Sequence, residues 1–172
     1  LNRNGAEIWR SSNGLQWSRA VTNGFGLPAN VAVTALTVMS DTLFAATENE
    51  TTGAEVWSSG NGQSWQRIAA GGFGNSDIMR ANALLAYRGM LYAGASHRTQ
   101  LQGGVWAYDG QTWHNASGAW VHNNQTYAFY EARALAVFGD MLHLGTSEAY
   151  IGATPAGPGV WRTTGPAAQP TT

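Results

Sequence analysis

The stretch Gly53-Ala54-Glu55-Val56-Trp57 decides the fold, because similar stretches recur along the chain. A first copy, Gly5-Ala6-Glu7-Ile8-Trp9, lies about 48 residues earlier, and shortened copies are Gly103-Gly104-Val105-Trp106 and Gly159-Val160-Trp161. Self-similarity at a fixed period is the mark of a repeat architecture, in which each repeat is one supersecondary unit. We therefore treat the repeat as the structural unit of the chain.

A second tryptophan follows each of the first three copies, after an Asn-Gly or Asp-Gly pair. The stretches are Asn13-Gly14-Leu15-Gln16-Trp17, Asn61-Gly62-Gln63-Ser64-Trp65 and Asp109-Gly110-Gln111-Thr112-Trp113. Such pairs between apolar flanks predict tight hairpin turns, in which both turn residues have a positive φ. Each copy therefore predicts two antiparallel strands joined by a short turn.

The other half of each repeat is an apolar hairpin, with copies at residues 35–47, 83–94 and 134–145. The turns of these hairpins are rich in Ser, Asp and Gly, which favour tight turns: Ser40-Asp41, Arg88-Gly89 and Gly139-Asp140. Each repeat should thus hold four short strands, two nearly all-apolar and two alternating. Four strands in 45–50 residues is the content of one β-propeller blade.

We expect an all-β domain of propeller blades over residues 1–165 and a Pro/Ala/Thr-rich linker or tail over residues 166–172. The chain begins on the last two strands of one blade, continues through two whole blades and stops after three strands of another, about thirteen strands in all. A closed propeller needs at least about four blades. The expected partners are therefore other blades of the same parent chain, or further copies that form a homo-oligomer.

Composition excludes several classes of protein. The net charge is −1 and only 11% of residues are charged, so the basic stripe of a nucleic-acid binder is missing. The chain has no cysteine, which excludes disulfides and thiolate metal sites. No apolar run reaches the roughly 18 residues that span a bilayer. Pro/Ala/Thr tails are frequent in exported modular proteins, so we expect an extracellular or cell-surface location.

One turn resembles the Asp-box of BNR-like β-propeller repeats, Ser-x-Asp-x-Gly-x-Thr-Trp, which occurs in sialidases and many exported bacterial proteins. The stretch is residues 58–65, where Ser58, Gly62 and Trp65 keep the pattern and Gly60 stands at the Asp position. The other copies are more degenerate. The resemblance implies a propeller fold, and it implies a structural role for the boxes, which lie away from the active face in that family.

The resemblance and the repeat also predict a role for the recurring side chains. Glu7 and Glu55 hold the same place in two copies, which indicates a structural hydrogen bond rather than a metal site. The hairpin tryptophans are expected to pack in the core or between blades. These structural residues are Trp9, Trp17, Trp57, Trp65, Trp106, Trp113 and Trp161.

The loop at residues 117–133 is the most unusual of the loops that join one blade to the next. Aromatic rings beside amides and carboxylates can stack on a sugar ring and hydrogen-bond its hydroxyls, so the loop predicts a carbohydrate site. The alternative is that these aromatic residues cover the rim of the propeller as ordinary packing. The candidate ligand-binding residues are Trp120, His122, Asn124, Tyr127, Tyr130 and Glu131, with Arg98 from a neighbouring loop.

Metal and cofactor signatures are missing from the sequence. Glu48 and Glu50 match no known calcium loop, and the four histidines show no ligand spacing. A glycosidase needs two facing carboxylates, or a Tyr/Glu pair as in sialidases, and only Tyr130 beside Glu131 suggests one. We expect a non-catalytic binding or assembly module for a glycan or protein ligand. The alternatives are a structural subunit of a cell-surface complex and a divergent sialidase-like glycosidase.

Overall fold

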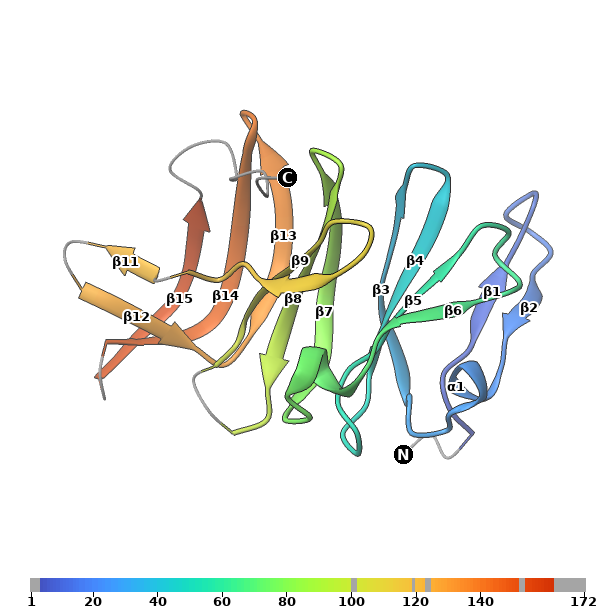
Figure 1. Ribbon diagram of the computed structural model, residues 1–172, viewed down its shortest axis with the longest axis horizontal. Helices are drawn as coiled ribbons and strands as arrows, with labels where there is room; N and C mark the ends of the chain where they lie inside the picture. Colours follow the sequence, from blue (N-terminus) through green and yellow to red (C-terminus); the bar gives the residue numbers. More distant parts are fainter. Residues whose placement is uncertain (1–3, 100–101, 119, 123–124, 152–153, 163–172) are drawn as a thin grey trace. The chain divides into compact units, whose positions relative to one another are not determined.

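The computed structural model describes residues 4–99, 102–118, 120–122, 125–151 and 154–162 (Figure 1). The chain divides into two compact units, Leu1–Ala81 and Asn82–Thr172, which are described one at a time. Nearly all of the regular structure is β-strand, as the sequence predicts. Over the described ranges, no helix is long and apolar enough to cross a membrane.

Unit 1 contains one whole blade and the outer half of another. Strands β3–β4–β5–β6 pair antiparallel in chain order, which is the strand order of a propeller blade, and β1 pairs with β2. The bounds are β1 (Ile8–Arg10), β2 (Ser18–Val21), β3 (Ala32–Met39), β4 (Thr42–Glu48), β5 (Val56–Ser59) and β6 (Gln66–Ala69). Two short helical turns, α1 (Asn23–Gly26) and η1 (Gly71–Gly74), follow the two outer hairpins.

Unit 2 holds a second four-stranded blade and three strands of a further one. Strands β7–β8–β9–β10 form the blade, β13–β14–β15 form the three-stranded part, and β7 begins at the end of unit 1. The bounds are β7 (Ile78–Tyr87), β8 (Met90–His97), β9 (Gly104–Tyr108), β10 (Trp113–Asn115), β13 (Ala132–Phe138), β14 (Met141–Ile151) and β15 (Thr154–Arg162). The chain is therefore built from β-propeller blades.

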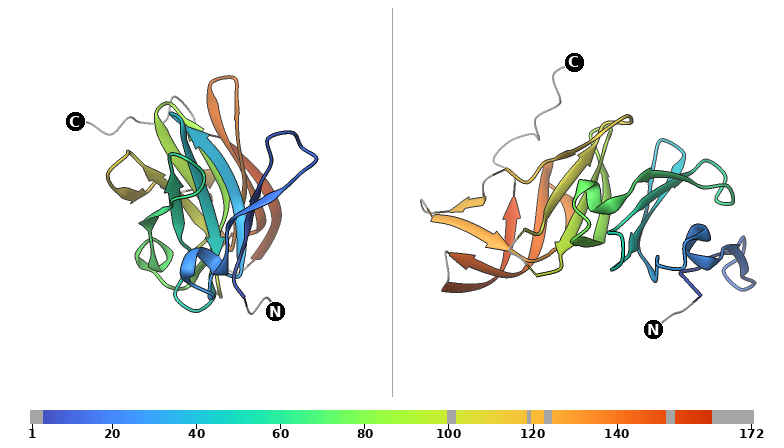
Figure 2. Two further views of the ribbon diagram at one scale, coloured as in Figure 1. Left: turned by 90° about the vertical axis from the view of Figure 1, so that its right-hand side faces the viewer. Right: turned by 60° about the horizontal axis from the view of Figure 1, so that its bottom comes forward.

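The structure adds one hairpin to the predicted strands. The described residues contain fifteen strands rather than about thirteen, because β11 (Trp120–His122) and β12 (Gln125–Phe129) lie inside the predicted loop 117–133. Strand β12 lies beside the far end of β14 (Figure 2), and Tyr127 pairs with Ile151. A β-branched and aromatic segment beside the edge of a long strand extends the sheet. The sequence analysis missed this hairpin because it has no counterpart in the other repeats.

The turns of the apolar hairpins are confirmed. Ser40 and Asp41 both have positive φ, as do Arg88 with Gly89 and Gly139 with Asp140, which is the geometry of a two-residue hairpin turn. The tight-turn prediction for the tryptophan hairpins is wrong. Only the glycine of each Asn-Gly or Asp-Gly pair has a positive φ, and the connecting loops are longer.

Side-chain oxygens hold these longer loops. The Asn61 Oδ1 accepts hydrogen bonds from the N–H groups of Gln63 and Ser64, at 2.9 and 2.8 Å, and the Ser59 Oγ accepts one from Gly62 at 2.8 Å. Asn and Asp side chains favour turns because they hydrogen-bond the backbone two or three residues on. Asn61 and Ser59 thus provide the acceptors that hold this loop.

Three backbone segments approach one another closely where successive repeats meet within a unit, and we call this arrangement the backbone crossing. In unit 1, the Ala54 N–H donates to the Ile78 carbonyl at 2.8 Å, and the Gly72 N–H donates to the Ala54 carbonyl at 3.0 Å. A Cβ on Gly53 would lie 2.5 Å from the Gly72 nitrogen, and φ of Gly53 is +90°. The repeated glycines are required because no side chain fits there.

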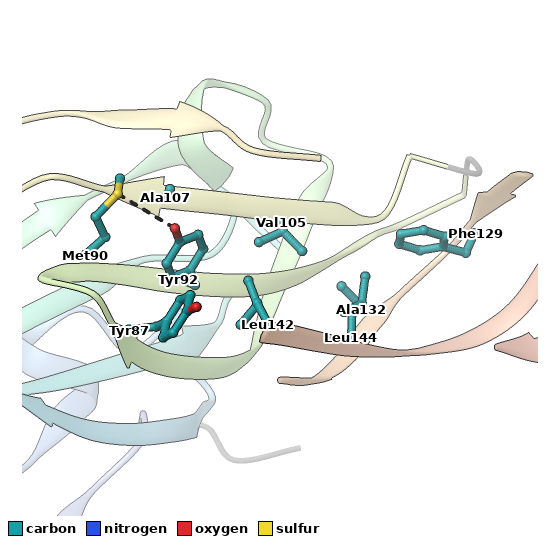
Figure 3. Close-up of a cluster of buried hydrophobic side chains, with 9 residues drawn as sticks. All are labelled: Tyr87, Met90, Tyr92, Val105, Ala107, Phe129, Ala132, Leu142 and Leu144. Carbon is teal, nitrogen blue, oxygen red and sulfur yellow. Dashed lines mark hydrogen bonds between the residues drawn. The ribbon is translucent and has the colours of Figure 1, made fainter. Parts of the chain in front are cut away.

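Hydrophobic packing fills the space between neighbouring blades within each unit. In unit 1, the Phe25 ring stacks on Trp57, with centroids 4.7 Å apart, and meets Trp65 edge-on. In unit 2, side chains of β7, β8 and β9 pack against those of β12, β13 and β14 (Figure 3). That cluster contains Tyr87, Met90, Tyr92, Val105, Ala107, Phe129, Ala132, Leu142 and Leu144. Each fully buried Val, Leu, Met or Phe side chain of the cluster stabilises the fold by about 1.5–3 kcal/mol.

Glu55 is the centre of a buried polar network in unit 1, as its recurrence in the repeat predicts. Its carboxylate accepts hydrogen bonds from Asn30 Nδ2 at 2.8 Å and Trp57 Nε1 at 3.1 Å, and it pairs with Arg67 at 2.8 Å. Glu7 makes the same contacts with Trp9 and Arg19. The Glu55 side chain is 3% exposed and that of Glu7 is 36% exposed.

Replacement of Glu55 by Ala should destabilise unit 1 by about 3 kcal/mol, because it leaves buried donors without their acceptor. The matched Glu7→Ala change removes the same contacts from a solvated site and should cost much less. Urea unfolding of the two variants measures the difference. Equal losses of stability would contradict the structural role assigned to Glu55.

A second prediction concerns acid. In unit 2, Arg88 in the β7–β8 turn pairs with Asp140 in the β13–β14 turn, and this contact lowers the pKa of the Asp140 carboxyl below its usual value. A lowered folded-state pKa contributes stability above the unfolded pKa of about 3.9, and that stability is lost as pH falls below about 4.

Asp140→Asn should therefore reduce the fall in Tm between pH 6 and pH 3, as measured by circular dichroism. Asp41→Asn is the matched control, since Asp41 holds the same turn position in unit 1 and has no ion pair among the described residues. An unchanged pH profile in Asp140→Asn would count against the ion pair.

Candidate functional site

The candidate site is built on residues 129–131, which lead into β13. The three successive carbonyls of this segment accept hydrogen bonds from the N–H groups of Gly103 at 2.8 Å, His97 at 3.0 Å and Ser147 at 3.1 Å. Ser96 also forms a β-bridge with Glu131. The segment is thus held from three directions, by the end of β8, the lead into β9, and β14. Loops that are fixed to a rigid scaffold in this way commonly carry binding residues.

Buried neighbours fix the position of the segment. The Phe129 side chain is 1% exposed and belongs to the hydrophobic cluster of unit 2. A Cβ on Gly103 would collide with the backbone of Tyr130 and Glu131, so only glycine allows this approach. The orientation of Tyr130 and Glu131 therefore follows from the core beneath them rather than from the loop alone.

Tyr130 meets Tyr150 of β14 at this place. The two rings lie edge to face, with centroids 6.0 Å apart and an angle of 88° between the ring planes. Both side chains are half-buried, so each ring keeps part of its surface in solvent. Edge-to-face pairs of this geometry are favourable, and they hold both rings in a fixed orientation.

Glu131 follows Tyr130 in the chain and forms an ion pair with Arg133. The Arg133 Nε and one Nη both contact the Oε2 atom of Glu131. In the part of the chain that the structure describes, the Oε1 atom has no hydrogen-bond donor, and the side chain is 18% exposed. The site therefore presents one carboxylate oxygen as an acceptor, and the Arg133 guanidinium, which is 61% exposed, as a donor. We refer to Tyr130, Tyr150, Glu131 and Arg133 as the tyrosine cluster.

Arg98 lies close to the tyrosine cluster along the chain fold. It follows His97, whose backbone N–H binds the Tyr130 carbonyl, and its side chain is exposed. Of the predicted binding residues, the structure thus brings Tyr130, Glu131 and Arg98 into one region.

The remaining predicted residues belong to the β11–β12 hairpin. Trp120 pairs with Tyr127 and His122 with Gln125 through the backbone, and the structure does not describe their side chains. Asn124 lies outside the described residues, as does the predicted tail at residues 166–172. The hairpin is anchored to β14 at Ile151, next to Tyr150 in the chain. The backbone of Tyr127 therefore lies opposite the residue that follows Tyr150 of the tyrosine cluster.

The structural tryptophans differ in burial. Trp57 and Trp106 are buried, and Trp65, Trp113 and Trp161 are half-buried. Trp113 stacks on Tyr108 with ring centroids 5.1 Å apart. The two tryptophans of the first hairpin are exposed instead, Trp9 to 49% and Trp17 to 59%.

Two residues of the tyrosine cluster were not among the predicted binding residues. Tyr150 belongs to the extension of β14, and Arg133, the last residue of the predicted loop 117–133, is the second residue of β13. An aromatic residue at the end of the second strand of a blade was the available signal for Tyr150. Within the described residues, no group of three or more His, Cys, Asp or Glu side chains could hold a metal ion.

No protein-family model and no curated protein matches the sequence. Solved structures similar to this chain include a Bacteroides ovatus protein described as "Xyloglucan PUL GH43B", with a TM-score of 0.47 and 12% identity. That match covers 96% of this chain and 36% of the other. A GH43 endo-arabinanase from Bacillus licheniformis has a TM-score of 0.39 and 14% identity, over 74% of this chain and 53% of that protein.

A thermostable family-43 glycoside hydrolase has a TM-score of 0.36 and 9% identity, over 76% of this chain and 53% of the other. This chain thus spans about a third of the length of the first of these structures and about half of the other two. At such low scores, the propeller fold of this chain rests on the strand order of its own blades.

Proposed function

We propose that the chain is a non-catalytic β-propeller module that binds a glycan at the tyrosine cluster. The observation that carries this proposal is the half-buried, edge-to-face pair Tyr130–Tyr150, which the Glu131–Arg133 ion pair follows along the chain. The aromatic surface would stack on the apolar face of a sugar ring. The Oε1 of Glu131 would accept a hydrogen bond from a sugar hydroxyl, and Arg133 would donate one to a sugar oxygen.

The size of the cluster favours a glycan over a protein ligand. Two rings and one ion pair match one or two sugar rings, whereas a stable protein interface buries about 800 Å² on each partner. The charges at the site are already paired with one another, so a neutral, hydroxyl-rich ligand can bind without leaving a charge unpaired. Arg98 would extend the contact to a second sugar.

The setting of the module is also a proposal. We infer an extracellular or cell-surface location from the Pro/Ala/Thr-rich stretch at residues 166–172, a composition that is frequent in exported modular proteins. We further infer kinship with Asp-box propeller repeats. The hydrogen bonds of Ser59 and Asn61 to the turn backbone support that kinship, because they are the type of contact that holds such a turn.

A glycan array followed by calorimetry on the best ligand tests the proposal. We expect Tyr130→Ala and Tyr150→Ala each to weaken binding about tenfold or more, since a well-placed aromatic contact is worth about 0.5–1.5 kcal/mol beyond its buried area. Glu131→Gln should also weaken binding, because it removes the charge that orients Arg133. Tyr108→Ala is the control, since Tyr108 stacks on Trp113 away from the tyrosine cluster.

Two results would contradict the proposal. The first is an array with no glycan above background, or one on which all three site variants bind as the unaltered chain does. The second is turnover of a bound glycan that is lost in Glu131→Gln, which would make the module a glycosidase instead.

A further inference from the structure

Unit 1 contains the tryptophan hairpin twice, once inside a whole blade and once without its inner strands. The β1–β2 register, Ile8 opposite Val21 and Trp9 opposite Arg19, repeats that of β5–β6, including the irregularity between the two pairs. Glu7 contacts Trp9 and Arg19 as Glu55 contacts Trp57 and Arg67. The whole blade therefore shows what the β1–β2 hairpin can bind.

The two copies differ in two contacts, the stacking of Phe25 on Trp57 and the pairing of β5 with β4. In the whole blade, the second edge of β5 pairs with β4, with Ala45 opposite Trp57 and Ala46 opposite Val56. Strand β1 pairs only with β2 within the described residues. Trp57 is 9% exposed and Trp9 is 49% exposed, although both indoles donate to the same recurring carboxylate. We call the second side of β1, with Glu7 and Trp9, the β1 edge.

Polar groups of β4 and of the segment before β3 complete the contacts of Glu55. The Asn30 Nδ2 donates to the Glu55 carboxylate at 2.8 Å. The Thr47 N–H donates to the Glu55 carbonyl, and the Thr47 Oγ1 accepts a hydrogen bond from the Glu55 N–H, each at 3.0 Å. Asn30 in turn accepts a hydrogen bond from Asn49 Nδ2 at 3.0 Å. A partner of the β1 edge must therefore carry an amide that donates to the Glu7 carboxylate. It must also carry a Thr whose hydroxyl accepts a hydrogen bond from the backbone N–H of Glu7.

We propose that the β1 edge is the docking site for a half-blade of this same repeat. The partner is a two-stranded antiparallel hairpin that carries an Asn at the place of Asn30 and a Thr at the place of Thr47. Its second strand would add to β1 as β4 adds to β5, and its Asn would donate to the carboxylate of Glu7. Addition of a strand to an open sheet edge is a general mode of recognition, in which the backbone provides affinity and side chains provide specificity.

Charge and edge chemistry support this partner. Glu7 is already ionised and oriented by Arg19, which lowers the pKa of its carboxyl, so it is prepared to accept a neutral amide donor. An open edge with an exposed tryptophan is prone to non-specific pairing unless a strand covers it. The half-blade would cover the open backbone edge and the part of the Trp9 indole that faces it, whereas Phe25 covers the stacked face of Trp57 in the whole blade.

A second copy of the chain does not fit this role. The candidate half-blades of the chain are β3–β4, β7–β8 and β13–β14, and each already pairs with a third strand, β5, β9 or β15. The partner must instead be a hairpin with no third strand of its own. A polypeptide segment other than those three hairpins must supply it.

A graft tests the proposal on the full chain. Residues 1–4 are replaced by a copy of residues 28–52, so that Gly5 follows the copied Thr as Gly53 follows Thr52. We expect hydrogen exchange at the indole N–H of Trp9 to slow at least tenfold, with the resonance assigned through Trp9→Phe. The amides of Ile8 and Arg10 should gain protection as well. Covalent attachment raises the effective concentration of the hairpin to the millimolar range.

The first control is a scrambled graft of the same composition. The second is a graft in which the copies of Asn30 and Thr47 are both replaced by Ala. Neither should slow the exchange of Trp9 as the intact graft does, and Glu7→Ala should reduce the effect of the intact graft. If the grafted chain does not fold, a peptide of residues 28–52 added to the unaltered chain should shift the Trp9 indole resonance.

Three outcomes would overturn the proposal. One is unchanged exchange at Trp9 in a folded, grafted chain, or no shift with the peptide at millimolar concentration. Another is equal protection by the scrambled graft. The third is sedimentation of the unaltered chain as a dimer that Trp9→Ala dissociates, since the β1 edge would then bind a second copy.

Discussion

The backbone crossing is the constraint on which the rest of each unit depends. Three backbone segments of unit 1 come within hydrogen-bond distance of one another at this crossing. They are the segment before β5 at Gly53, the turn after β6 at Gly72 and the start of β7 at Ile78. The same arrangement recurs at Gly5 and Gly24. An isolated four-stranded sheet leaves its apolar faces exposed to water. The apolar faces of the blades therefore stabilise the fold only when neighbouring blades are held against each other. The glycines allow that contact at the cost of conformational entropy in the unfolded chain.

The candidate site is a consequence of the corresponding crossing in unit 2. There, Gly103 approaches the backbone of Tyr130 and Glu131, and Phe129 anchors the segment in the core. The tyrosine cluster thus uses a scaffold position that the repeat already makes rigid, and it adds side chains that the other repeats lack. Functional residues grafted on a repeated scaffold are expected to break the repeat in this way.

The repeat made the blades predictable from the sequence, because glycine, tryptophan and turn residues recur wherever the backbone requires them. The turns Ser40-Asp41 and Gly139-Asp140 followed from local chemistry alone. The Asn-Gly loops did not, because Asn61 accepts hydrogen bonds from the following N–H groups and does not adopt the left-handed conformation, which only Gly62 has. Tyr130 and Glu131 could be predicted from an unusual loop, whereas the contact of Tyr150 with Tyr130 could not, because it arises only when β14 extends past the core.

The central claim is that the crossings hold neighbouring blades together. Hydrogen–deuterium exchange resolved at single amides tests this claim most directly. The N–H groups of Ala54, Gly72 and Gly103 lie outside the strands, yet each donates to a carbonyl at a crossing. Their exchange should therefore require the opening of a whole unit and should be as slow as that of the central strands. Exchange at these three amides as fast as in unprotected loops would contradict the account.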